Sequence, residues 1–392
     1  MTAFGMTLPT LAYLAQDFGA SDVQVGLLAA CYHAMQLLLA PVWGSASDRI
    51  GRRPILLVGL LGYAAAFFLS SFAGSLGALF AAQLLAGAIG SATLPGVRAS
   101  VGDITSIENR GRGMGLIGAA IGLGFVFGPG LAFGLIHSRQ GDLAGASLVE
   151  LHRLPFRVAA GVALAVPLLL LLLSLPAPVI SGERARGLAV FGALGRALRG
   201  PVRDVYLAAL GGTLAFSMLE AALPLYVKAR FAHEAFLPAS YLAKAFVAMG
   251  VVGVIVQGGL VARLIGSLGE ARTAAFGLAV AAVGLGIVPF FSSPDALLVA
   301  LSTLAVGMGL LRPSIATLVS RRAVAGQGEA VGVLDGFESL GRATGKPFGG
   351  ALHEFSSPAP FGAAAVLAAI AILPLAIGGW LATRRPAASE DA

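Results

Sequence analysis

The chain has 392 residues, of which 57% are hydrophobic and 11% charged, and its net charge is +7. Charged residues make up about a quarter of an ordinary soluble domain, so this composition excludes a soluble protein and is typical of one built for lipid. The basic residues lie in short clusters at the ends of apolar runs, so the positive charge does not predict nucleic-acid binding. The lone cysteine, Cys31, excludes an internal disulfide and a cysteine metal cluster.

Apolar runs long enough to cross about 30 Å of hydrocarbon, at about 1.5 Å of helix per residue, recur along the chain. Before the first of them, residues 2–14 would form a helix only about 20 Å long. We therefore expect a shortened first helix, and the sequence favours a start upstream of Met1. The eleven predicted spans are 23–43, 55–72, 76–97, 113–136, 156–175, 205–227, 241–261, 271–291, 296–319, 328–352 and 361–381.

The positions of Lys and Arg predict the orientation of these spans. When the short helix 2–14 is counted as the first of twelve, seventeen of the 26 fall in or within two residues of the even-numbered loops and the C-terminal tail, and five fall in or within two residues of the odd-numbered loops. Cytoplasmic loops carry an excess of Lys and Arg. We therefore expect a multi-pass protein of the inner (plasma) membrane with a cytoplasmic C-terminus.

The two halves of the chain echo one another. Four residue pairs recur at offsets of 214 to 218, namely Pro9 and Pro224, Arg49 and Arg263, Pro95 and Pro313, and Gly128 and Gly345. These offsets argue for a duplicated six-span unit, which is a known transporter architecture. We expect an all-α polytopic membrane protein of two six-helix bundles related by pseudo-two-fold symmetry. The predicted divisions are an N-terminal bundle 1–175, a cytoplasmic linker 176–203, a C-terminal bundle 204–385 and a cytoplasmic tail 386–392.

The predicted span 328–352 carries four charges at helical spacing: Asp335, Glu338, Arg342 and Lys346. These positions lie on one stripe of a helix, and Glu338 and Arg342 form an i,i+4 pair. Each charge would cost several kcal/mol if it faced lipid, so the stripe should face a water-filled cavity or the other half. An internally neutralised ladder and a role in handling substrate or protons remain equally open.

Four other polar residues within spans are candidates for handling substrate or protons. Glu220 has no basic residue nearby in sequence, and an unpaired, desolvated carboxylate tends to hold a proton. It is therefore the best single candidate for proton coupling or cation recognition, although loop water could instead solvate it. His33 and Gln36 share nearly one helix face and could relay protons, but a packed, hydrogen-bonded histidine is the favoured interpretation. Arg312 could bind an anionic substrate group or simply extend to the membrane interface.

Two motifs resemble those of a transporter family. Gly44-x3-Asp48-Arg49-x-Gly51-Arg52-Arg53 separates two predicted spans and resembles the signature loop of the major facilitator superfamily. Gly124-x3-Gly128-Pro129 resembles the glycine–proline motif of that family's drug:proton antiporters, which include multidrug and tetracycline exporters. Where these antiporters usually carry an arginine, this chain has Gln83.

The resemblance implies that the predicted tight loop 44–53 is a gate that helps to hold the cytoplasmic side shut. Arg49 and Arg53 could donate forked hydrogen bonds to a carboxylate or to helix-end carbonyls. Asp48 adds nothing to positive-inside anchoring, so we favour a gate over a simple anchor. In the expected hinge, the spacing of Gly124 and Gly128 favours close helix packing, whereas Pro129 removes a helix hydrogen bond.

These features predict a secondary active transporter that moves a small organic molecule by alternating access, with proton-coupled efflux as the leading hypothesis. A metabolite importer or facilitator, and a scaffold or receptor that kept the fold and lost transport, are the alternatives. The histidines are scattered and no metal-ligand spacing occurs, so we expect no enzyme and no cofactor other than a proton gradient. The expected partners are a small-molecule substrate, protons and the lipid bilayer, without nucleic acid, and we expect a monomer.

Overall fold

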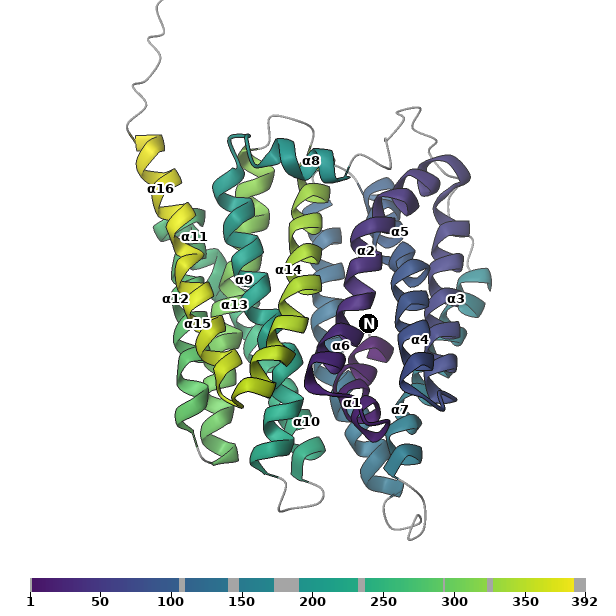
Figure 1. Ribbon diagram of the computed structural model, residues 1–392. Helices are drawn as coiled ribbons and strands as arrows, with labels where there is room; N and C mark the ends of the chain where they lie inside the picture. Colours follow the sequence, from purple (N-terminus) through teal and green to yellow (C-terminus); the bar gives the residue numbers. More distant parts are fainter. Residues whose placement is uncertain are drawn as a thin grey trace, which may run out of the picture.

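Helices account for nearly all of the chain that the computed structural model describes, which is residues 2–105, 110–139, 148–172, 190–231, 237–291, 293–322 and 327–383 (Figure 1). No strand occurs within these ranges, and ten helical stretches in them are long and apolar enough to cross a membrane. The prediction of an all-α polytopic membrane protein is confirmed.

The first half of the chain supplies seven α-helices and one 3-10 turn within the described residues. They are α1 (Thr2–Asp17), α2 (Asp22–Ile50), α3 (Arg52–Ser71), α4 (Leu76–Ala88), η1 (Gly90–Ala92), α5 (Thr93–Ile104), α6 (Arg110–Arg139) and α7 (Leu148–Leu172). Helix α1 has 16 residues and is therefore only about 24 Å long.

The second half follows the same plan. Its elements are α8 (Val190–Ala197), α9 (Arg203–Arg230), α10 (Leu237–Ile255), η2 (Val256–Leu260), α11 (Val261–Leu268), α12 (Glu270–Ile287), η3 (Val288–Phe290), α13 (Pro294–Arg322), α14 (Gln327–Phe355), α15 (Ala359–Ile370) and α16 (Ile372–Thr383). Helix α14 is long enough to span but is absent from the ten apolar stretches, because it carries the charged stripe. The first part of the predicted linker, 176–189, and the predicted tail lie outside the described residues.

Single glycines make the turn at two corresponding places. Gly51 joins α2 to α3 with φ 105°, and Gly269 joins α11 to α12 with φ 80°. Glycine is favoured at such angles because it has no Cβ. The prediction of a loop over 44–53 is therefore wrong in extent, since α2 continues through Asp48 to Ile50 and only Gly51 lies outside the helices. Loss of hydropathy marks the end of the hydrocarbon, whereas Ser, Ala, Asp and Arg are all compatible with a helix that continues into the interface.

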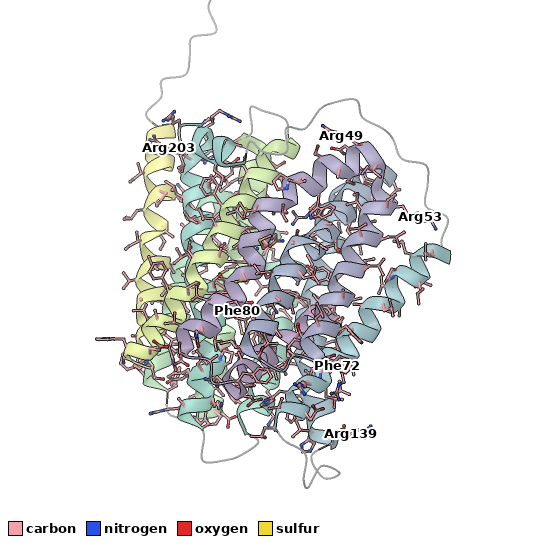
Figure 2. All side chains as sticks on the ribbon, turned by 45° about the vertical axis from the view of Figure 1, so that its right-hand side comes forward. Arg49, Arg53, Phe72, Phe80, Arg139 and Arg203 are labelled. Atoms are coloured by element: carbon pink, nitrogen blue, oxygen red, sulfur yellow. The ribbon has the colours of Figure 1, made fainter. Side chains whose placement is uncertain are left out.

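The two halves lie side by side, and α2 of the first packs against α14 of the second (Figure 1). Helix α8 crosses the helix ends at the top of Figure 1. Arg49, Arg53 and Arg203 lie toward this end and Arg139 toward the other (Figure 2). We call these the arginine-rich end and the opposite end; α2 therefore begins at the opposite end.

The apolar cores of the two halves meet between them. The larger buried cluster belongs mainly to the second half but includes Tyr13 and Leu37 of the first. The second cluster belongs mainly to the first half but includes Leu225 of α9. Removing about 100 Å² of apolar side chain from water stabilises a folded arrangement by about 2.5 kcal/mol. The halves therefore share apolar surface where they are in contact, which favours the closed arrangement.

Candidate functional site

The charged stripe of α14 is satisfied by three ion pairs. Arg342 donates to Glu338 at 2.7 Å on the same helix, as the i,i+4 spacing predicted. The Lys346 ammonium lies 3.1 Å from the Glu220 carboxylate of α9. Asp335 pairs with Arg98 of α5, which belongs to the first half and lies 237 residues earlier in the chain. The stripe thus faces α9 and the other half, as its charges require.

Burial of these side chains shows that they do not face lipid. Only 2% of the Lys346 side chain and 13% of the Glu220 side chain is exposed. For Glu338 and Arg342 the exposed fractions are 18% and 20%. Charges this deep in a membrane protein need a partner or water, because a lone charge at bilayer depth is costly. These four side chains therefore lie in the interior of the molecule.

The prediction that Glu220 is unpaired is wrong. Its partner, Lys346, lies 126 residues further along the chain, on another helix. The closing of α14 onto α9 brings the two together. Glu220 is consequently a carboxylate held by one buried ammonium.

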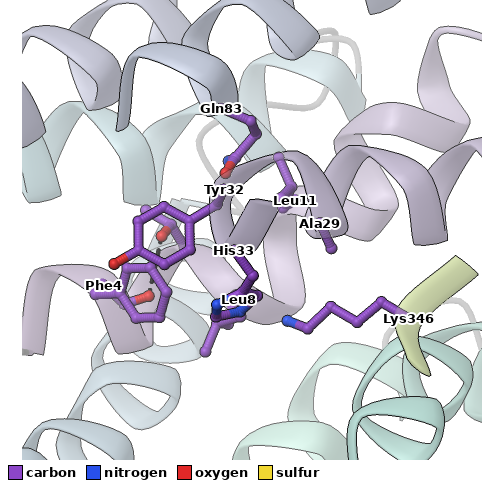
Figure 3. Close-up of a pocket in the computed structure, with 9 residues that line it drawn as sticks. Phe4, Leu8, Leu11, Ala29, Tyr32, His33, Gln83 and Lys346 are labelled. Carbon is purple, nitrogen blue, oxygen red and sulfur yellow. Dashed lines mark hydrogen bonds between the residues drawn. The ribbon is translucent and has the colours of Figure 1, made fainter. Parts of the chain in front are cut away.

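A small cavity lies beside this pair and between the halves (Figure 3). Its volume is about 20 Å³, which is room for one or two waters and far from the several hundred Å³ of a drug-sized site. Figure 3 shows the Lys346 side chain extending from α14 toward His33 of α2. The lining residues are Phe4, Thr7, Leu8, Leu11, Ala29, Tyr32, His33, Gln83 and Lys346. This cavity is therefore too small for a substrate, which can enter it only after the halves separate there.

The buried histidine of this cavity agrees with the favoured interpretation. The Nδ1 atom of His33 lies 3.2 Å from Gln36 Oε1, and its ring meets the Tyr32 ring edge to face at 4.8 Å. Gln83 of α4 also lines the cavity. In the sequence, Gln83 was notable only because it stands where the antiporters usually carry an arginine. Both polar groups are therefore available to a ligand that enters here.

Two of the helix pairs that join the halves are in contact at the opposite end. Between α1 and α9, the Tyr13 hydroxyl donates to the Pro224 carbonyl at 3.4 Å, and Lys228 donates to Gln16 at 2.8 Å. None of these four residues carried a functional signal in the sequence. Their contacts show that α1 and α9, the first helices of the two halves, are joined near this end.

The pair α2 and α14 closes the same end more tightly. His353 Nδ1 lies 2.6 Å from Asp22 Oδ2. A Cβ added to Gly26 would overlap the Lys346 carbonyl oxygen, and one added to Gly350 would overlap the Asp22 carbonyl oxygen. Glycine therefore permits backbone-to-backbone contact between the halves here.

The Major Facilitator Superfamily model matches residues 1–345 and 268–392. The chain belongs to this superfamily. It is 29% identical over 369 residues, or 94% of its length and 90% of the relative's, to multidrug resistance protein 1 of Bacillus subtilis (strain 168). It is 40% identical over 159 residues, or 40% of its length and 37% of the relative's, to the class C tetracycline resistance protein of Escherichia coli. The structure of a human organic anion transporter matches with a TM-score of 0.68 at 24% identity over 95% of each chain, which supports the fold.

Membership of the superfamily confirms the family resemblance, the fold and the prediction of a secondary active transporter. The signature segment of the superfamily holds together three helices of the first half. Arg52 pairs with Asp48 and also donates to Ser47 at 3.3 Å. Arg53 donates to the carbonyls of Leu170 and Leu171, at 3.3 and 2.9 Å, at the end of α7.

These contacts include the helix-end carbonyl bonds that the sequence suggested for Arg53. Arg49 is exposed in the structure, and a Cβ added to Gly44 would meet no atom within 4 Å. The gating residues thus fix α2, α3 and α7 to one another. Their role as a gate stays a prediction.

Gly124 and Gly128, which were expected to form part of a hinge, lie where α6 packs against α1. A Cβ on Gly5 would overlap the Gly124 carbonyl oxygen, and one on Gly128 would lie 2.6 Å from the Gly5 carbonyl carbon. Helix α6 continues through Pro129 without a break. Close approach of α1 to α6 is therefore the structural use of Gly124 and Gly128, and the hinge role of Pro129 stays a prediction.

Among the inter-half contacts near the arginine-rich end, the pair of Arg98 and Asp335 gives a direct prediction. The two side chains are 33% and 43% exposed, so the pair should stabilise the closed state by only about 0.5–1 kcal/mol. Arg98→Gln should therefore raise the fraction of molecules open at this end about two- to fivefold. Distances between spin labels at Ser100 and Gly332, in a Cys31→Ser background, would measure that fraction. The exchange Arg98→Asp with Asp335→Arg should restore the wild-type distribution, and a failure to restore it would separate the effect from this pair.

Proposed function

We propose that this transporter exports a small organic molecule from the cytoplasm in exchange for protons, with Glu220 as the proton-carrying group. The observation that carries the proposal is the buried pair of Lys346 and Glu220 in the second half, next to a small cavity that residues of the first half line. Multidrug and tetracycline resistance relatives support efflux over import. The bias of Lys and Arg supports a plasma-membrane protein with the arginine-rich end and the C-terminus in the cytoplasm. The transporter would work as a monomer.

The ion pair explains how a proton and a substrate can compete. When the opposite end is open, Glu220 takes up a proton, and the neutral carboxyl no longer attracts Lys346. When the arginine-rich end is open, Glu220 loses the proton. Substrate binding and proton release are linked because both change the charge around Lys346. Closure requires the charges to be matched, since an unmatched charge at membrane depth is costly.

The domain division into 1–175, 176–203 and 204–385 belongs to the same proposal. In the transport cycle each bundle moves as one body around the cavity, and the linker joins them on the cytoplasmic side. The signature segment 44–53 keeps the first bundle rigid during this movement, and Pro129 lets α6 bend.

Everted membrane vesicles provide the test. Their lumen is acidified by respiration, so proton-coupled efflux predicts that tetracycline, ethidium or 2-naphthoate accumulates inside at least tenfold faster with the gradient than after its collapse by an uncoupler. Vesicles without the protein give the background. Equal accumulation with and without the gradient, for all three compounds, would exclude proton-coupled efflux.

A further inference from the structure

Arg312 is a charged side chain of the second half that none of the three ion pairs includes. It lies in α13, ten residues before the helix ends at Arg322, which is about 15 Å along the axis. Its side chain is exposed, although it belongs to the middle of a membrane-spanning stretch. Among the described residues, no carboxylate lies within 4 Å of its guanidinium.

The exposed face of Arg312 is directed inward. Its electrostatic neighbours are Glu338, Arg342, Glu220 and Asp335, which all belong to α14 and α9. Val299, an exposed apolar residue of the same helix, lies thirteen residues earlier and so about 140° away around the helix. Arg312 therefore shares the interior space with the charged stripe rather than facing lipid with Val299.

The charges around this space do not balance. Three acids, Glu220, Asp335 and Glu338, each have a basic partner in Lys346, Arg98 and Arg342. Arg312 is a fourth cation, and among the described residues it has no acid of its own. An unmatched cation at membrane depth is costly, and a bound anion would offset that cost.

The cavity next to the stripe offers an apolar wall for the rest of such a molecule. Phe4 and Tyr32 line it, with ring centroids 5.3 Å apart, and Leu8 and Leu11 add aliphatic surface. Lys346 belongs both to this cavity and to the pair with Glu220, so it connects the apolar wall to the cationic region. A ligand with an aromatic body and one acidic group would use both.

We propose that the transported molecule carries a carboxylate, as an organic anion or a zwitterion, and that Arg312 binds that carboxylate when the halves open. This inference rests on the proposed function and names its substrate class. Arginine suits the role because its planar guanidinium can donate two parallel hydrogen bonds to one carboxylate. The bound anion completes the charge balance and so permits the halves to close around it.

Equilibrium binding to the purified protein in detergent tests the substrate class without any proton gradient. The probes share one naphthalene body: 2-naphthoate, 2-naphthylmethanol and 2-naphthylmethyl-trimethylammonium. We expect 2-naphthoate to bind at least tenfold more tightly than the alcohol and the ammonium compound. Arg312→Gln should remove this preference, and Arg312→Lys should keep part of it because the charge remains but the forked geometry is lost.

Arg321→Gln is the matched control, because Arg321 lies on the same helix and its side chain is 69% exposed at the helix end. Binding by this variant should equal that of the wild type. Equal affinity for the carboxylate and the alcohol, or an unchanged preference in Arg312→Gln, overturns the inference. If the inference is overturned but the ammonium compound is transported in a proton-driven way, the proposed function still stands. If the carboxylate binds but no transport is proton-driven, this inference is supported and the result counts against proton coupling.

Discussion

Replacing Glu220 by glutamine is expected to abolish proton-driven transport, with a loss of at least a hundredfold in the gradient-dependent rate. Glutamine cannot exchange a proton, so the charge around Lys346 can no longer alternate. Glu220→Asp should retain a measurable part of the rate, because the carboxylate remains but must reach further. Accumulation of 2-naphthoate or tetracycline in everted vesicles, with and without the gradient, measures the loss.

The same change has a second effect that must be separated from the first. With Glu220 replaced, the Lys346 ammonium, 2% exposed, loses its carboxylate partner. Removing one member of a buried ion pair typically destabilises a protein by about 3–5 kcal/mol. The double variant Glu220→Gln with Lys346→Gln removes both charges and should regain most of the thermal stability of the wild type, but none of the proton coupling.

A carboxylate near the opposite end provides the control for these variants. Glu150 pairs with Arg153 and Arg157 at the start of α7, away from the cavity. Glu150→Gln should leave both the melting temperature and the proton-driven rate close to the wild-type values. If the double variant at Glu220 and Lys346 transported as fast as the wild type with an imposed gradient, Glu220 would have no part in coupling.

Replacing Gly350 by valine is expected to hold the opposite end open and to lower transport at least tenfold. A side chain here would overlap the backbone of Asp22, so α2 and α14 could no longer meet. The overlap involves backbone atoms, which cannot move aside as a flexible side chain could. Alternating access requires this end to close in each cycle, so the block acts on the whole cycle.

Labelling by a membrane-impermeant maleimide measures the effect directly. A cysteine at position 225, in a Cys31→Ser background, replaces a leucine that is 2% exposed near the closed end. We expect slow labelling in the otherwise unchanged protein and labelling at least tenfold faster with Gly350→Val. Gly332→Val is the control on the same helix, since a Cβ there meets no atom within 4 Å. Equal labelling of the two valine variants would show that this contact does not keep the end shut.

The sequence predicted the helices better than their partners. Within the described residues, each predicted span coincides with a helix or with consecutive helices, because a 20-residue apolar run has few other stable forms in lipid. The i,i+4 pair of Glu338 and Arg342 could also be predicted from the sequence, since helical spacing is a local property. In these cases the information lies within one short stretch of chain.

The ion pairs between helices could not be obtained in that way. The spacing predicts only that Lys346 belongs to the charged stripe and that Glu220 is unpaired, yet the two side chains bind one another. Arg98 was counted only among the basic residues that set orientation, whereas it pairs with Asp335. Charge sign and period do not say which helices become neighbours. That information comes from the packing of whole bundles, which here depends on glycines at close contacts.

The one-residue turns at Gly51 and Gly269 leave no slack between the helices that they join. A hairpin with so short a turn cannot absorb a displacement, so movement of one of its helices is transmitted to the other. Each half therefore moves as a rigid body, and the resistance to this movement is concentrated at the interface between the two halves. Substitutions at that interface should change the cycling rate far more than equal substitutions inside either half.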